Sequence, residues 1–182
     1  IGDLKFTINK KWEDLPFTSV LLADNNKIFH LAEKKIYYRM GIHNTTTRDL
    51  FVSNPKIVDI FNVLEILEQN FKDRQIYEKY IDQIRTIYII NVLRRIADIK
   101  SWMDISCEEK KIIVNGLINI LEIKYNNFDN SIIENVASLF NPLAEYNLKQ
   151  INNHMLDDSL RTETDENKIK QNIVELIKKN NK

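Results

Sequence analysis

The chain has 182 residues, and its 26 Lys plus Arg balance 26 Asp plus Glu, so its formal net charge is zero. This balance excludes a nucleic-acid binder that relies on bulk positive charge. Apolar residues make up 43% of the chain, which excludes a disordered chain, and three Gly with three Pro disfavour a turn-rich all-β fold.

The first fifty residues predict short strands around one helix. Residues 6–8, 27–31 and 35–39 are rich in Ile, Phe and Tyr, which favours strands. Between the first two of these segments, Pro16 is suited to be the first residue of a short helix, where its missing N–H costs no hydrogen bond. Trp12, Glu13 and Asp14 would then lie in the turn that leads into this helix.

From Pro55 onward the apolar residues follow a helical period. Residues 57–71 carry one apolar stripe, and a second helix is predicted over 76–92, with Arg94 and Arg95 near its end. Ser106 and Glu109 have the spacing of a capping box, which predicts that a third helix starts there. The inward positions predicted for the second helix are Ile76, Tyr77, Tyr80, Ile81, Ile84, Ile87, Tyr88 and Val92, and those for the third are Ile112, Ile113, Leu117, Ile120 and Leu121.

The C-terminal third predicts further helices and a linker. Ser131 and Glu134 repeat the capping signal before a helix that stops at Asn141, and another helix is predicted over 143–155. Residues 156–167 are polar and acidic and are interpreted as a linker. The last amphipathic segment, 169–177, has three interpretations: a docking helix, a surface-seeking basic tail or a solvated, frayed terminus.

These patterns predict an α+β, predominantly helical fold. We expect a mixed segment over residues 1–54, a helical extension over 55–155, and an acidic linker with a terminal helix over 156–182. A single cysteine, Cys107, excludes an internal disulfide and suits a reducing compartment. No apolar run approaches the roughly 20 residues of a membrane span, and no signal peptide is recognisable, so a cytoplasmic location is expected.

Two patches carry residues suited to chemistry. Glu13 and Asp14 form an acidic pair before the predicted helix, where one carboxylate could act as a general base; the simpler interpretation is charge complementation of the helix N-terminus. The second patch, residues 37–48, combines guanidinium, imidazole, amide and hydroxyl groups that suit a diphosphate, although an ordinary surface loop has similar composition. Its candidate ligands are Arg39, His43, Asn44, Thr45 and Arg48.

The two patches in order resemble a known family. The run Trp-Glu-Asp-Leu-Pro-Phe-Thr, a helix, the run Lys-Ile-Phe-His-Leu-Ala-Glu-Lys-Lys-Ile-Tyr-Tyr-Arg, and a loop ending in Thr47 and Arg48 are similar to the C-terminal half of the catalytic region of family 2 glycosyltransferases with the GT-A fold. The likeness is greatest to bacterial enzymes of capsule and surface-polysaccharide assembly. The helices after residue 55 look like the extension that many of these enzymes carry.

The resemblance implies roles for the two patches. Asp14 would be the catalytic base of an inverting transfer, with Glu13 orienting the acceptor and Trp12 contacting it. The loop would bind the donor diphosphate through Arg39, His43, Asn44, Thr45 and Arg48. The family also implies Mn²⁺ or Mg²⁺, for which His43 is the candidate ligand in this chain. The implied partners are a nucleotide-sugar donor and a glycan acceptor, with no nucleic acid.

Two features of the family are missing. The Asp-any-Asp motif and the nucleotide-binding βαβ half do not occur before Trp12, so we expect a fragment that is inactive alone. Peripheral association with the inner face of the membrane and self-association are further expectations. The rival interpretation is a noncatalytic helical module for protein interaction or dimerisation. The two differ at the first fifty residues, because the enzyme needs Asp14 and the 39–48 loop on one cleft.

Overall fold

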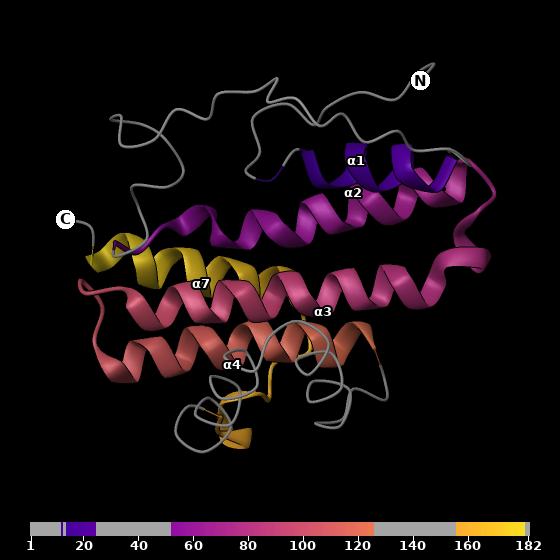
Figure 1. Cartoon of the computed structure of the whole chain (residues 1–182). Coiled ribbons are helices and arrows are strands. Elements are labelled where there is room, and N and C mark those ends of the chain that lie inside the picture. The colour runs from indigo at the N-terminus through magenta and orange to yellow at the C-terminus, as the bar shows by residue number, and fades with distance from the viewer. Residues whose placement is uncertain (1–11, 13, 25–51, 126–155, 181–182) are drawn as a thin grey trace, which may run out of the picture. The chain divides into compact units, whose positions relative to one another are not determined.

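The computed structural model describes residues 12, 14–24, 52–125 and 156–180 (Figure 1). The chain forms two compact units, one of residues 1–49 and 59–81 and the other of residues 50–58 and 82–182. The elements described are α1 (Asp14–Asp24), η2 (Pro55–Val58), α2 (Asp59–Asp73), α3 (Tyr77–Ser101), α4 (Cys107–Lys124), η3 (Asp158–Leu160) and α7 (Glu166–Asn180).

The predicted α+β class is wrong for the part of the chain that the structure describes, where every regular element is helical. The strand prediction came from the β-propensity of three short Ile-, Phe- and Tyr-rich segments, and such propensity is a weak guide without a known packing context. Those segments, residues 6–8, 27–31 and 35–39, lie outside the described residues, as do the helices predicted for 131–141 and 143–155.

In the first unit, α1 packs against α2. The predicted helix near Pro16 is confirmed, and it begins two residues earlier, at Asp14. Pro16 and Val20 are its buried residues. The far end of α1 is held by Arg74, whose Nε lies 3.0 Å from Asp24 Oδ2. These contacts make α1 a short helix fixed at both its middle and its end.

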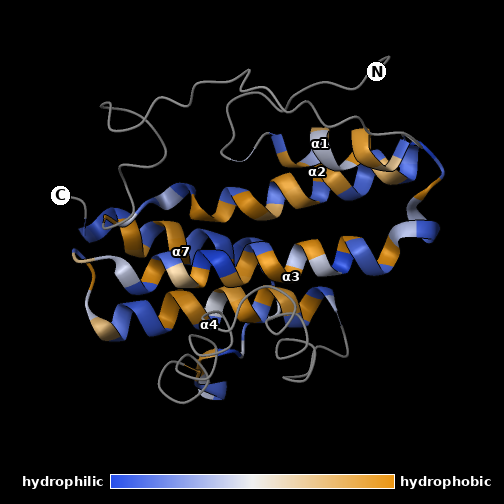
Figure 2. Ribbon diagram, viewed as in Figure 1, coloured by the Kyte–Doolittle hydropathy of each residue, from blue (hydrophilic) through white to orange (hydrophobic). Residues whose placement is uncertain are grey.

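The apolar stripe predicted for residues 57–71 is confirmed in η2 and α2. Figure 2 shows the hydrophobic residues interleaved with polar ones along α2. The residues of the stripe are all buried: Ile57, Ile60, Phe61, Leu64, Leu67 and Phe71.

Helix α2 ends in a tight turn, in which the Gln75 N–H donates to Lys72 O and the Ile76 N–H donates to Phe71 O. Gln75 has a left-handed φ of 58° there, a conformation that is common at helix ends and that usually favours glycine.

The second predicted helix is confirmed as α3, which extends beyond Arg95 to Ser101. Its inward register differs in part from the prediction. Ile81 is exposed and Ile87 half-buried, although both were predicted to point inward. The residues buried along α3 are Ile84, Tyr88, Ile89, Val92, Ile96 and Ile99.

Helix α4 starts with the predicted capping box. Ser106 is the N-cap, its Oγ accepts from the Glu109 N–H at 3.3 Å, and Glu109 Oε2 accepts from the Ser106 N–H at 3.1 Å. Such reciprocal bonds satisfy donors that a helix start otherwise leaves unpaired. The inward positions predicted for this helix are confirmed except for Ile112, which is exposed.

Helix α7 packs on α4 and on η2 in the second unit. Three isoleucines spaced by four residues, Ile169, Ile173 and Ile177, are buried along one side of it. Gly116 on α4 makes this approach possible, because a Cβ there would lie 3.0 Å from Ile173 Cδ1 and 3.2 Å from Ile169 Cγ2. Of the three interpretations of the C-terminal segment, the docking helix is the one that the structure shows.

The segment before α7 is tied to α4 by two buried asparagines. Asn115 Oδ1 accepts from the Asp157 N–H at 2.9 Å, and Asn119 Nδ2 donates to Glu163 O at 2.7 Å. Arg161 pairs with Glu122 of α4 as well. The predicted acidic linker is therefore held on α4, because asparagine side chains of α4 bond to its main chain and Arg161 pairs with Glu122.

Replacing Gly116 with valine tests the close α4–α7 contact. The added side chain should overpack Ile173 and lower the free energy of unfolding by about 1–3 kcal/mol. Ile173→Ala alone should cost about 2–5 kcal/mol through the cavity that it leaves. The double variant should lose clearly less than the sum, as measured by chemical denaturation, because the cavity accepts the valine. Strictly additive losses would mean that the two side chains do not meet.

Acid should weaken the junction of α4 and α7. The pKa of Glu109 lies below its ordinary value of 4.5, because Asn180 Nδ2 and the Ser106 hydroxyl and N–H donate to its carboxylate. A lowered folded-state pKa stabilises the fold above the ordinary pKa, and this stabilisation is lost as the pH falls through the folded value. The melting temperature should therefore fall less steeply in Glu109→Gln than in the unmodified chain between neutral pH and about pH 3. Parallel curves for the two proteins would contradict this role.

Candidate active site

The N-terminal end of α1 presents an exposed carboxylate. Asp14 is the first residue of the helix, and its side chain is exposed. The preceding turn is closed by a hydrogen bond from the Leu15 N–H to Trp12 O at 3.1 Å. A carboxylate in this position is accessible to a hydroxyl group in solution or on a bound molecule, which is the first requirement for a general base.

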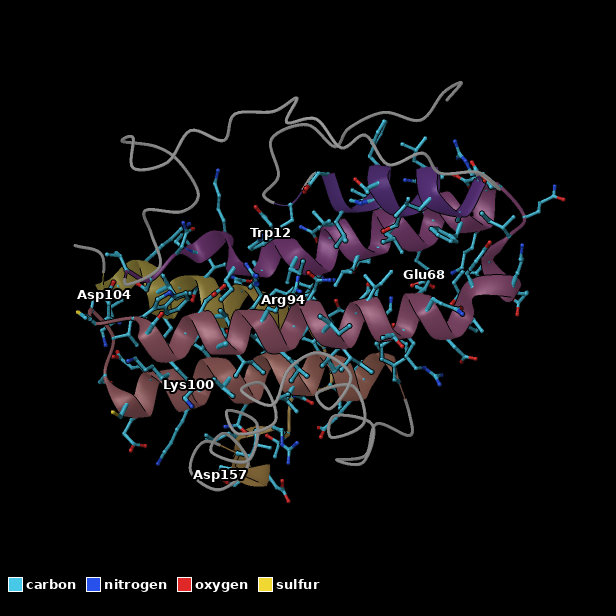
Figure 3. All side chains as sticks on the ribbon, in the orientation of Figure 1. Trp12, Glu68, Arg94, Lys100, Asp104 and Asp157 are labelled. Carbon is cyan, nitrogen blue, oxygen red and sulfur yellow. The ribbon has the colours of Figure 1, made fainter. Side chains whose placement is uncertain are left out.

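Trp12 shapes the turn in front of Asp14. Its φ is 60°, in the left-handed region that costs a bulky residue of the L series about 1–3 kcal/mol. Its side chain is half-buried, and Figure 3 labels it beside the start of α1. A strained conformation of this kind persists only where the surroundings hold it in place, and such residues are enriched at binding and catalytic sites.

The other predicted site residues lie outside the described residues. These are Glu13, Arg39, His43, Asn44, Thr45 and Arg48. Of the predicted site residues, the structure describes Trp12 and Asp14, which are two positions apart in the sequence, and their relation to the diphosphate loop stays a prediction. Among residues 12, 14–24, 52–125 and 156–180, no group of three or more His, Cys, Asp or Glu side chains could hold a metal ion.

The chain leaving the predicted diphosphate loop is anchored in the second unit. Ser53 donates its N–H to both carboxylate oxygens of Asp104, at 2.8 and 3.1 Å, and its hydroxyl to Oδ2 at 2.6 Å. Figure 3 labels Asp104 near the C-terminal end of α3. Ser53 is only 5% exposed, so the carboxylate satisfies two donors that have little access to water.

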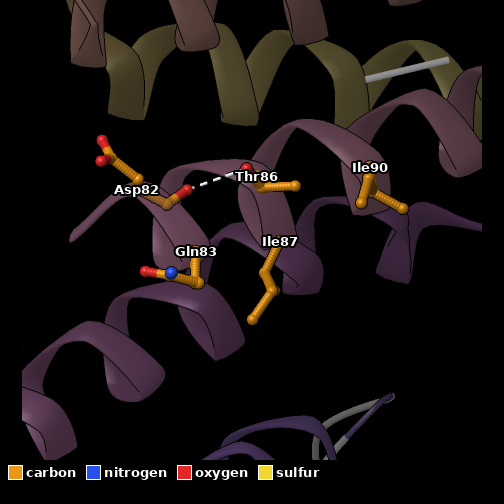
Figure 4. Close-up of a pocket in the computed structure, with 5 residues that line it drawn as sticks. All are labelled: Asp82, Gln83, Thr86, Ile87 and Ile90. Carbon is orange, nitrogen blue, oxygen red and sulfur yellow. Dashed lines mark hydrogen bonds between the residues drawn. The ribbon is translucent and has the colours of Figure 1, made fainter. Parts of the chain in front are cut away.

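Helix α3 carries a shallow hollow on its surface, shown in Figure 4. Its volume is about 280 Å³, below the roughly 300–1,000 Å³ of small-molecule pockets. Thr86 donates its hydroxyl to Asp82 O at 2.8 Å, so this hydroxyl is engaged within the helix. The described lining, Asp82, Gln83, Thr86, Ile87 and Ile90, has an aliphatic side and one carboxylate, and it offers no pair of catalytic groups.

A cluster of rings and cations joins α3 to the end of α4. The Tyr88 and Tyr125 rings meet edge to face at 5.7 Å. Lys124 Nζ lies 4.6 Å from the Tyr88 ring centroid, and the Arg85 guanidinium lies 5.3 Å from that of Tyr125. Contacts of this kind stabilise packing by roughly 0.5–1.5 kcal/mol each, so the cluster is interpreted as part of the helical framework.

Sequence reasoning missed the polar contacts of the second unit. Ser53 and Asp104 are 51 positions apart, and neither lies in a motif. Asn115 and Asn119 did carry a signal, because two amides among the buried positions of an amphipathic helix require hydrogen-bond partners. The buried amides thus predict that hydrogen-bond partners exist, but they do not predict that these are main-chain groups of Asp157 and Glu163.

No family model, curated protein or solved structure matches the chain. Among the described residues, no helix is both long enough and apolar enough to cross a membrane. The functional interpretation therefore depends on the residues themselves and on the geometry around α1.

Proposed function

We propose that this chain contributes the acceptor side and the donor-diphosphate loop of an inverting glycosyltransferase. The enzyme would move a sugar from a nucleotide-diphosphate donor to a hydroxyl of a glycan or surface-polysaccharide acceptor. The observation that supports this most directly is the exposed Asp14 carboxylate at the start of α1, behind the strained Trp12 turn. The resemblance of the motifs around it supplies the reaction class.

In this proposal Asp14 removes the proton from the acceptor hydroxyl. The acceptor oxygen then forms a bond to the anomeric carbon of the donor, while the bond from that carbon to the diphosphate oxygen breaks. The electron pair leaves with the nucleoside diphosphate, and the proton stays on Asp14 until it exchanges with solvent. A single displacement from the opposite face inverts the anomeric configuration.

The remaining residues have positioning roles in this proposal. Trp12 would contact the acceptor and Glu13 would orient it, while the 39–48 loop would bind the diphosphate. Mn²⁺ or Mg²⁺ would neutralise the diphosphate charge when bound. The candidate ligand of this ion, His43, lies outside the described residues, and the proton transfer assigned to Asp14 needs no metal.

The second candidate function is a noncatalytic helical interaction module. It is favoured by the hollow on α3, whose aliphatic side is formed by Ile87 and Ile90. Both side chains are half-buried, and an apolar strip that a helix leaves partly accessible is suited to another amphipathic helix. In this case Asp14 would only complement the helix dipole, and its removal would affect stability alone.

Asp14→Asn separates the two candidates. In the polypeptide encoded by the whole reading frame that contains this chain, the substitution should lower kcat for sugar transfer by about 10²–10⁴-fold while nucleotide-sugar affinity stays nearly unchanged. Asp59→Asn is the matched control, because Asp59 opens α2 as Asp14 opens α1. Each substitution should cost roughly 0.3–1 kcal/mol of stability through the helix dipole.

Only Asp14→Asn should affect turnover in this comparison. Equal and small changes in kcat for the two variants would assign Asp14 to helix capping. An unmodified polypeptide that transfers no sugar from any nucleotide donor would contradict the proposed function as a whole.

A further inference from the structure

We infer that Asn115 is a site of spontaneous deamidation, which the docking of the C-terminal segment on α4 keeps unreactive. The chain contains three glycines, and Gly116 is the one that follows an asparagine. Glycine has no side chain to hinder attack by its own main-chain nitrogen, so this reaction is easiest at an Asn-Gly pair. The inference concerns the second unit alone and does not depend on the proposed function.

The reaction consumes water and needs no other reagent. The main-chain nitrogen of Gly116 bonds to Asn115 Cγ, the Cγ–Nδ2 bond breaks, and ammonia leaves with the proton of the former N–H. Water then opens the resulting five-membered imide on either side of its nitrogen. Opening at the side-chain carbonyl leaves aspartate. Opening at the main-chain carbonyl leaves isoaspartate, in which the backbone runs through the side-chain carbons.

Two sets of contacts oppose the first step in the folded chain. Asn115 and Gly116 lie inside α4, where the helical ψ and the main-chain hydrogen bond of the glycine N–H keep this nitrogen from the side chain. Asn115 is fully buried, and its amide is bonded at both ends: Oδ1 accepts from the Asp157 N–H at 2.9 Å, and Nδ2 donates to Lys111 O at 2.8 Å. Ring closure therefore requires that these bonds break and that water reaches the pair.

Helix α7 covers the glycine of the pair. Ile173 Cδ1 lies 3.0 Å from the position that a β-carbon of Gly116 would occupy, and Ile169 Cγ2 lies 3.2 Å from it. Both isoleucines are buried. Attack on Asn115 therefore needs a local opening of α4 that also separates it from α7, and the rate should follow the population of that opened state.

The product does not fit the closed state. A carboxylate at position 115 can still accept from the Asp157 N–H, but it cannot donate to Lys111 O, and it brings a charge into a fully buried place. Isoaspartate adds one atom to the backbone of α4 and so interrupts the helix. Deamidation thus converts a transient opening of α4 and α7 into a permanent one.

Asn119 is a matched internal control. It lies one turn after Asn115, is only 5% exposed, and also ties the C-terminal segment to α4, since its Nδ2 donates to Glu163 O at 2.7 Å. Its following residue is Ile120, whose branched side chain hinders ring closure. Opening of the helix exposes both amides, and the chemistry should select Asn115.

Peptide mapping by mass spectrometry measures both rates in the polypeptide from the whole reading frame, at mildly alkaline pH, with and without denaturant. In denaturant, Asn115 should exchange its NH₂ group for OH about 10-fold or more faster than Asn119. In the folded chain both amides should stay intact over the same period. The reacted chain, returned to native buffer, should be cleaved by a protease in α7 faster than the unreacted chain.

Ile173→Ala tests the part played by α7. It leaves the Asn-Gly pair unchanged and weakens the docking of α7, so the Asn115 rate in the folded protein should rise about 10-fold or more. Ile173→Val should act in the same direction with a smaller factor, and it serves if the alanine variant does not fold. Leu67→Ala is the control, because it removes a fully buried side chain of α2 in the first unit and should leave the rate unchanged.

Four results would overturn the inference. Equal rates at Asn115 and Asn119 in denaturant would remove the chemical preference, and equal Asn115 rates in the folded and denatured chains would remove the protection. Equal acceleration in Leu67→Ala and Ile173→Ala would assign the reaction to general unfolding. Equal protease cleavage of the reacted and unreacted chains would show that the product fits the closed state.

Discussion

The packing of α7 against α4 and η2 is the contact on which the second unit depends. Ile169 and Ile173 reach α4 only because Gly116 has no side chain, and a β-carbon there would meet Ile173 at 3.0 Å. The same helix packs on η2, so the last helix described in this unit covers the segment that follows Ser53. Two segments of the second unit that are more than a hundred residues apart in the sequence, η2 and α7, therefore pack in one core.

The first unit depends on the packing of α1 against α2. Helix α1 has only 11 residues, too few to be stable by itself, and its packing on α2 provides the stability that its length does not. The buried Pro16 and Val20 hold the helix on α2, and its first residue, Asp14, keeps an exposed carboxylate two positions after the strained Trp12.

Much of the helical part could be predicted because its signals are local. The capping box of Ser106 and Glu109 and the apolar stripe of α2 need only a few neighbouring residues to be recognised. The register of α3 was predicted less well, because isoleucines and tyrosines surround that helix on several sides and no single face stands out. Burial along it is decided by tertiary packing.

The α+β class failed for a related reason: β-propensity in short segments depends on context that a single sequence lacks. Of the candidate site, only Trp12 and Asp14 lie within the described residues, so the convergence of the acidic pair and the loop stays a prediction. The Ser53–Asp104 anchor could not be predicted, since 51 residues separate its two partners and neither side chain is unusual locally.

The central claim is a single displacement at the anomeric carbon by an acceptor oxygen that Asp14 has deprotonated. The anomeric configuration of the sugar in the product, determined by NMR after transfer by the polypeptide from the whole reading frame, tests it most directly. A single displacement should give a product whose anomeric configuration is opposite to that of the donor. A product that retains the donor configuration would contradict it.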